Sequence, residues 1–146
     1  MFLNELNKEE AICFLNLVSI FTKVDNKFAR EEQVLVDEYK EELGINSEEI
    51  ITIEYDDIIN KLSNSSEKSK LIIYFELVAL ALVDGDYEDQ EVDFLEEISS
   101  KFKVSRSKRF EIANYFYNFT DSYKSTTVDV DNNIELLRER AQAIIN

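Results

Sequence analysis

The chain has no histidine and no proline, and its 146 residues include two glycines and one cysteine. Because histidine is absent, Ser-His-Asp and Cys-His catalytic sites are excluded, as is any metal site that needs imidazole. A single cysteine cannot form an internal disulfide, and Cys13 lies in an apolar run, which predicts packing rather than a role as nucleophile. The scarcity of glycine and proline argues against a β-sandwich with its many turns and favours helices joined by short links.

Basic residues are also scarce: 16 Lys and Arg stand against 31 Asp and Glu, which gives a net charge of −15. A polyanion such as DNA binds by exchanging its counterions for Lys and Arg, so we expect no nucleic-acid partner. The partners that this charge favours are cations and proteins or peptides with a basic surface. High negative charge can also serve solubility alone, and that simpler explanation stays open.

Long apolar runs are limited to residues 71–83, which include Glu76. A membrane span needs about 20 residues, so this shorter run predicts a buried central helix and no membrane insertion. Glu76 is expected on a helix edge that faces solvent. The first ten residues have neither the basic segment nor the small-residue cleavage site of a signal peptide, so we expect a cytoplasmic protein.

What the sequence does contain predicts a single all-α domain over residues 1–146. Hydrophobic residues make up 45% of the chain, enough for a core, and they recur at helical spacing, which predicts about seven helices. Asn7 with Glu10 is typical of a helix start, Gly44 is typical of a helix end, and Ser105 is a candidate cap. The predicted helices cover residues 8–24, 29–43, 67–83, 88–102, 106–123 and 132–145, with a short helix that ends near Leu62.

Two parts of the chain repeat one pattern at an offset of 59 residues. Residues 24–45 overlay residues 83–104 without a gap, and both their apolar positions and their acids coincide. The acids that coincide are Asp25 with Asp84, Glu32 with Glu91 and Glu38 with Glu97. The repeat predicts two pseudo-symmetric helical hairpins, at about 8–45 and 67–104, that bury their apolar faces against each other.

Glu91 differs from the other acids of its predicted helix. The positions three and four residues on, which share its helix face, hold Phe94 and Leu95, so Glu91 heads the core-facing row. Glu32 occupies the same place in the first repeat, and the aspartate of each repeat extends an apolar row to its loop end. The remaining acids of this helix belong to a face that simply meets water: Glu88, Asp89, Asp93, Glu96 and Glu97.

A carboxylate that points inward must find hydrogen-bond donors or a cation, because desolvation of a bare charge is costly. In one interpretation the glutamate accepts backbone N–H bonds from its turn, the aspartate orders the same turn, and no ligand is needed. In the other, the acids share a hard divalent cation such as Ca²⁺, Mg²⁺ or Mn²⁺, which prefers oxygen ligands. The candidate metal ligands are then Asp84, Glu91, Asp25 and Glu32.

The richest aromatic cluster predicts core packing rather than stacking on nucleic-acid bases. At helical spacing Ile112, Phe116 and Phe119 form one row, with Phe110 and Ala113 beside it. The net negative charge agrees with this interpretation.

The segment "LALVDGDYEDQEVDFLEEISSKFKVS" (80–105) resembles the TerB-like family, which is associated with bacterial tellurite resistance and related stress systems. The pattern that carries the resemblance is Asp-Gly-x-aromatic-x-x-x-Glu after an alanine-containing apolar helix. The resemblance implies an all-α fold of about seven helices built from two related halves, in agreement with the repeat. A similar module occurs in some membrane-anchored DnaJ-type co-chaperones.

The resemblance also implies metal binding, which in TerB-like domains is proposed for the acids of the Asp-Gly turn and the following helix. Those positions are Asp84 and Glu91 here, with Asp25 and Glu32 in the weaker first repeat. In that repeat Asn26 replaces the glycine, and two basic residues, Lys27 and Arg30, enter the turn and reduce its negative field.

The sequence therefore predicts a binding or scaffold module rather than an enzyme. A metal-free acidic interaction domain is the first alternative. The second is a hydrolase that uses paired carboxylates and a metal ion to activate water, although the sequence contains no nucleophile constellation.

Overall fold

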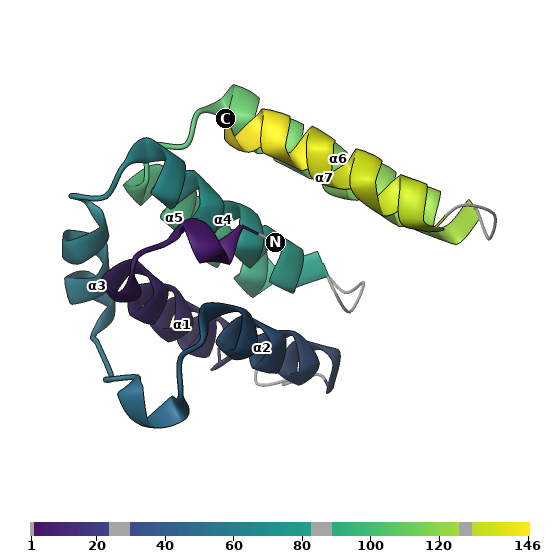
Figure 1. Cartoon of the computed structure of the whole chain (residues 1–146). Helices are drawn as coiled ribbons and strands as arrows, with labels where there is room; N and C mark the ends of the chain where they lie inside the picture. Colours follow the sequence, from purple (N-terminus) through teal and green to yellow (C-terminus); the bar gives the residue numbers. More distant parts are fainter. Residues whose placement is uncertain (1, 24–29, 83–88, 126–129) are drawn as a thin grey trace. The chain divides into compact units, whose positions relative to one another are not determined.

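A computed structural model describes residues 2–23, 30–82, 89–125 and 130–146 of the chain (Figure 1). Within these residues the structure contains seven α-helices and no β-strand, which confirms the predicted all-α class. The helices are α1 (Lys8–Lys23), α2 (Arg30–Leu43), α3 (Tyr55–Leu62), α4 (Glu67–Leu82), α5 (Asp89–Lys101), α6 (Arg106–Ser125) and α7 (Val130–Ile145). Two short 3-10 helices, η1 (Leu3–Glu5) and η2 (Ser47–Glu49), precede α1 and α3.

The chain divides into two compact units, Met1–Phe102 and Lys103–Asn146, which we call unit 1 and unit 2. Unit 1 contains α1 to α5 and unit 2 contains α6 and α7. Nothing in this division tests the single domain expected over residues 1–146 or the pseudo-symmetric relation of its halves, and both stay predictions. In the part of the chain that the structure describes, no helix is long and apolar enough to cross a bilayer.

The ends of the first helices follow the local sequence signals. The Asn7 side chain accepts the backbone N–H of Glu10 at 2.8 Å, and the Glu10 carboxylate accepts the N–H of Asn7 at 3.0 Å, which is the reciprocal capping box. At the end of α2, Gly44 adopts a φ of 63°, and the N–H of Ile45 reaches back to the carbonyl of Lys40 at 3.2 Å. This left-handed closure favours glycine and confirms Gly44 as the end of α2.

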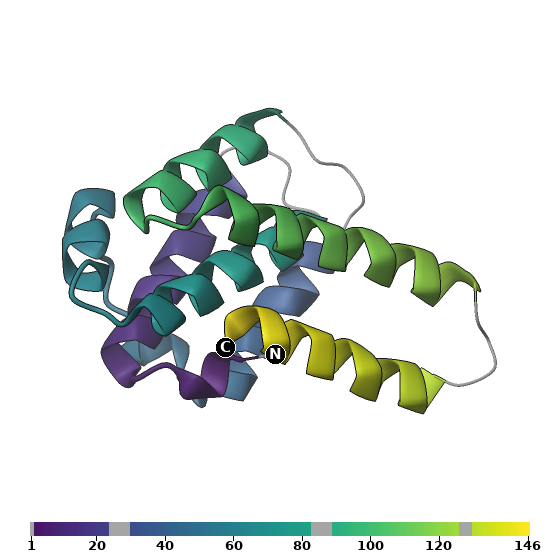
Figure 2. The same cartoon turned by 90° about the horizontal axis from the view of Figure 1, so that it is seen from above.

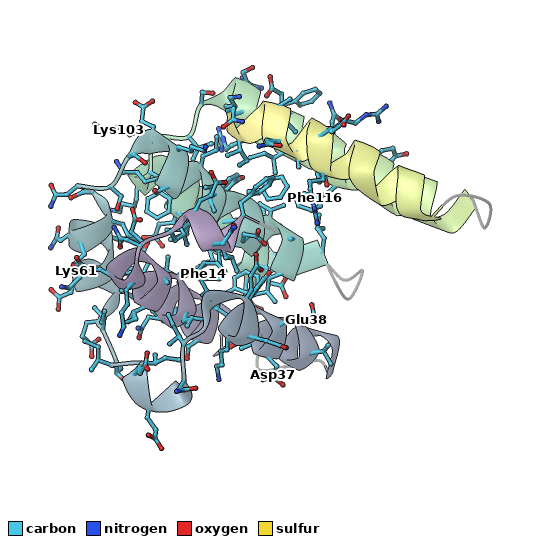
Figure 3. The ribbon with its side chains drawn as sticks, in the orientation of Figure 1. Phe14, Asp37, Glu38, Lys61, Lys103 and Phe116 are labelled. Atoms are coloured by element: carbon cyan, nitrogen blue, oxygen red, sulfur yellow. The ribbon has the colours of Figure 1, made fainter. Side chains whose placement is uncertain are left out.

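Helices α1 and α4 form the centre of unit 1. Helix α1 contacts α2, α3 and α4, and α4 also contacts α5 and η1. Phe14 of α1 is fully buried, whereas Asp37 and Glu38 lie on the exposed side of α2 (Figure 3). Helix α4 is buried around most of its circumference, as expected for a helix that is apolar on all sides. The buried residues of α4 are Ile72, Ile73, Tyr74, Phe75, Glu76, Leu77, Val78, Leu80 and Ala81.

Glu76 does not face solvent, so that expectation is wrong. Its exposed fraction is 3%, and its carboxylate accepts the backbone N–H of Phe2 at 3.0 Å. The hydroxyl of Tyr39 donates a hydrogen bond to the backbone carbonyl of Glu76 at 3.3 Å. The N-terminal segment therefore covers the side of α4 that helical periodicity alone would leave exposed.

Unit 2 is a helical hairpin in which α6 and α7 run side by side (Figures 1 and 2). The hydroxyl of Ser105 accepts the N–H of Lys108 at 3.1 Å, which confirms Ser105 as the cap of α6. The Lys108 ammonium donates to the carbonyl of Ile144 near the end of α7 at 2.6 Å, a contact that suits the negative end of a helix.

The predicted aromatic row of α6 is correct in part. Ile112 is buried and Phe116 is half-buried, whereas the side chain of Phe119 lies outside the described residues. Phe110 is 68% exposed and Ala113 is exposed, so their predicted packing is wrong. Helix α6 carries apolar side chains on both of its faces, and sequence periodicity cannot tell which face meets α7.

The contrast between the buried Ile112 and the exposed Phe110 on α6 gives a stability prediction. Ile112→Ala should lower the free energy of unfolding by about 2–4 kcal/mol because it leaves a cavity, whereas Phe110→Ala should change it by less than about 0.5 kcal/mol. Urea denaturation followed by circular dichroism measures both. Equal losses would mean that Phe110 is packed in solution.

The buried carboxylate of α4 gives a second prediction. Glu76→Ala should lower the free energy of unfolding by about 2–3 kcal/mol, because the N–H of Phe2 loses a charged acceptor inside the protein. Glu96→Ala is the matched control, since Glu96 is an exposed acid. The same denaturation experiment compares the two, and a loss no larger for Glu76→Ala would contradict the burial of its carboxylate.

Candidate functional site

The candidate site centres on Glu91, in the first turn of α5. Its exposed fraction is 2%, which confirms the prediction that it faces the core. Leu95 and Ile98, on the same side of the helix, are also buried. The described acids on the rest of α5 are exposed, as expected: Asp89, Asp93, Glu96 and Glu97.

Aromatic contacts hold the start of α5 against two other helices of unit 1. The ring of Phe94 lies 5.6 Å from the ring of Phe21 on α1, and 6.3 Å from the ring of Tyr55 on α3, measured between centroids. Phe21 belongs to the last turns of α1 and Phe94 to the first turns of α5. The helix ends that border the two acid-containing turns of the repeat are therefore neighbours.

Of the four predicted metal ligands, Glu91 is the one whose side chain the structure describes. Asp25 and Asp84 lie outside the described residues, and Glu32 lies in α2 with a side chain that is likewise not described. The convergence of these acids on Glu91 stays a prediction. Among the side chains that the structure does describe, no three acids or cysteines come close enough together to hold a metal ion.

Tyr55 was not singled out by the sequence, yet it lies against the same part of α5. Its hydroxyl is buried and has no hydrogen-bond partner among the described residues. Burial first, and then the carboxylates of Glu97 and Asp56, raise the pKa of this hydroxyl to about 12. No local signal marks the residue, because its environment comes from α5, which is distant in the sequence.

Cys13 is fully buried, as its apolar surroundings in the sequence predicted. Burial, followed by the negative charge of Glu9, raises the pKa of its thiol. It lies beside a polar pocket of about 390 Å³ that is also lined by Asn7 and Lys61. A thiol with a raised pKa is a poor nucleophile, which agrees with a packing role.

Comparison with known protein families, curated proteins and solved structures finds no match for the chain. The resemblance to the TerB-like family therefore stays a prediction that depends on the quoted motif.

The buried hydroxyl of Tyr55 gives a prediction with a pH dependence. In the unfolded chain this hydroxyl ionises near its ordinary pKa of 10.0, whereas in the folded chain it stays protonated up to about 12. Its protonated form therefore contributes stability that is complete below pH 10 and is lost as the pH rises through about 12. Tyr55→Phe removes this loss.

The measurement is the free energy of unfolding of wild type and Tyr55→Phe at several pH values from neutral upward. At neutral pH the variant should be as stable as wild type or slightly more stable, because it removes a buried donor that has no acceptor among the described residues. In the alkaline range its advantage should grow. A Tyr55→Phe variant that is less stable than wild type at every pH would show that the hydroxyl makes a hydrogen bond.

Proposed function

We propose that the chain is a cytoplasmic TerB-like binding or scaffold module of a bacterial stress system of the tellurite-resistance type. In this proposal a divalent cation binds at the acid-rich turn that leads into α5. Asp84 and Glu91 are the principal ligands, and Asp25 and Glu32 contribute from the first repeat. The module has no catalytic step of its own.

The burial of Glu91 is the observation that carries the proposal. An acid in the first turn of a helix is stabilised by the helix dipole while still exposed, so the dipole alone does not require it to be buried. Desolvation penalises the charged form, and the cost is offset when the carboxylate meets donors or a cation. The exposed acids of the same helix show that α5 can place carboxylates in water, which sets Glu91 apart.

The chemistry of the predicted ligands supports a hard cation. All four are carboxylates, and carboxylate oxygens suit Ca²⁺, Mg²⁺ and Mn²⁺ better than softer metals. The contact between Phe21 and Phe94 supports a shared site, because it brings together the helix ends that border the two turns. Bound there, the ion would supply positive charge that neutralises the acids and fixes the approach of α5 to α1.

A scaffold with this charge is suited to partners with basic surfaces. Unit 1 carries most of the acidic excess: residues 1–102 contain 25 Asp and Glu but nine Lys and Arg. Complementary charge speeds the encounter with a basic partner and weakens binding to acidic ones.

Thermal unfolding in the presence of Ca²⁺, Mg²⁺ or Mn²⁺ tests the cation. At an ion concentration one hundred times the dissociation constant, binding should stabilise the fold by about 2.7 kcal/mol, which raises the melting temperature. Asp84→Asn and Glu91→Gln should abolish that rise, whereas Glu96→Gln, which alters an exposed acid on the same helix, should retain it. Calorimetric titration of the same three variants measures the binding directly.

The variants also separate the two interpretations of Glu91. If no ion stabilises the wild type but Glu91→Gln lowers its melting temperature, the carboxylate serves local hydrogen bonds and the cation proposal is wrong. If no ion acts and neither substitution changes stability, both interpretations fail.

A further inference from the structure

Residues 50–54, "IITIE", form the irregular segment between η2 and α3 in unit 1 (Figure 1). Three isoleucines and a threonine make it β-branched at four successive positions, a composition that favours extended backbone. At its end Glu54 has φ −68° and ψ 150°, which is extended. The exposed fraction of the Ile51 side chain is 67%, large for an apolar residue.

The side chain of Asn16 on α1 holds one edge of this segment. Its amide nitrogen donates to the carbonyl of Ile51 at 2.9 Å, and its amide oxygen accepts the N–H of Ile53 at 3.0 Å. In a parallel β-sheet, one residue of the neighbouring strand makes the same pair of bonds: it donates to the carbonyl of one residue and accepts the N–H of the residue two positions later. Here those two groups are the carbonyl of Ile51 and the N–H of Ile53. The Asn16 amide therefore replaces one residue of a neighbouring strand. It is nearly buried, and it also donates to the carbonyl of Ile12 at 2.9 Å, which fixes its orientation.

The opposite edge of the segment follows from this contact. In an extended chain, successive residues direct their N–H and C=O groups to opposite sides, so Thr52 directs both of its groups away from Asn16. Ile50 lies two residues earlier, so in an extended chain its C=O group points to the same side as that of Thr52. Among the described residues Thr52 makes no hydrogen bond, and Thr52 is exposed. An edge that is already extended can accept an added strand without the full entropic cost of ordering it.

The charge around this edge selects its partner. From residue 41 to residue 60 the sequence contains seven Asp and Glu and no Lys or Arg. The acids nearest the segment in sequence are all exposed: Glu48, Glu49, Glu54, Asp56 and Asp57. One of these acids, Glu49, forms an ion pair with Lys8 of α1, with 3.5 Å between Glu49 Oε2 and Lys8 Nζ. The edge thus combines exposed backbone donors and acceptors, one exposed isoleucine and a strong negative field.

We propose that the free edge of residues 50–54 is a docking site for a basic, extended peptide segment of a partner protein. The peptide binds as an added strand: its backbone exchanges hydrogen bonds with the N–H and C=O of Thr52, an apolar side chain covers Ile51, and its Lys or Arg side chains meet the surrounding acids. This inference rests on the role as a binding module proposed above, but not on the cation, because no residue of the segment is one of the predicted metal ligands.

Binding of a short peptide of alternating lysine and valine to the full chain tests the proposal, with fluorescence anisotropy as the readout. Thr52→Pro removes the Thr52 N–H, and proline and the residue before it both suit extended backbone, which the segment favours. It should weaken binding by roughly tenfold or more, because a backbone bond is lost and the ring obstructs the strand. Thr52→Val, the matched control, keeps the N–H and should bind within about twofold of wild type.

Two further measurements keep the result interpretable if Thr52→Pro also perturbs the fold. The same peptide with N-methylated backbone nitrogens keeps its charge and side chains but loses its donors, and should bind much more weakly to the wild type. Amide hydrogen exchange of Thr52 should be fast in the free chain and should slow when the unmodified peptide is added.

The outcomes are distinct. Absence of binding at millimolar peptide, equal binding of the N-methylated peptide, or an unprotected Thr52 amide in the complex would each overturn the proposal. Equal binding by wild type and a well-folded Thr52→Pro would do so as well, since it would reduce the interaction to charge alone. A failed cation titration leaves this test unaffected, and a failed peptide titration leaves the cation at α5 unaffected.

Discussion

The burial of carboxylates in a strongly acidic chain is the constraint on which the structure depends. Glu10, Glu76 and Glu91 are buried, with at most 8% of each residue exposed, in a chain of net charge −15. A carboxylate removed from water needs donors, and the spare backbone N–H groups of a helix occur in its first turn. Glu10 and Glu91 lie in such first turns. Glu76 lies in the middle of α4, where all N–H groups are used, so its donor must come from elsewhere, and the N–H of Phe2 provides it. The hydrogen bond from Phe2 to Glu76 thereby fixes the N-terminal segment against α4.

Features that depend on residues within one or two turns of each other could be predicted from the sequence. The Asn7–Glu10 capping box, the glycine closure at Gly44 and the Ser105 cap each involve partners at most five residues apart along the chain. The inward position of Glu91 belongs to the same class, because helical periodicity places it in the row of Leu95. Such signals define helix ends and buried faces, and they account for the agreement on an all-α fold.

Features that depend on distant residues could not be predicted. Phe2 and Glu76 are 74 positions apart, and Asn16 lies 35 positions from the carbonyl it binds. Tyr55 depends in the same way on α5. Nothing in the local pattern around Asn16 distinguishes a polar residue that faces solvent from one that holds a second segment. Phe110 shows a second limit, since an aromatic residue at the helical spacing of a buried row is exposed.

The acids around residues 50–54 also disfavour pairing of this extended edge with the same edge of a second copy of the chain. An unpaired edge is a template for pairing with any other strand, including the same edge of a second copy. Here two copies would bring together the same exposed carboxylates, and like charges in close contact are unfavourable. Since the repulsion disappears when the incoming strand is basic, the same charges that disfavour pairing between copies favour a basic partner. In the proposed complex selectivity thus comes from charge, whereas affinity comes from a backbone segment that the Asn16 amide already holds by two hydrogen bonds.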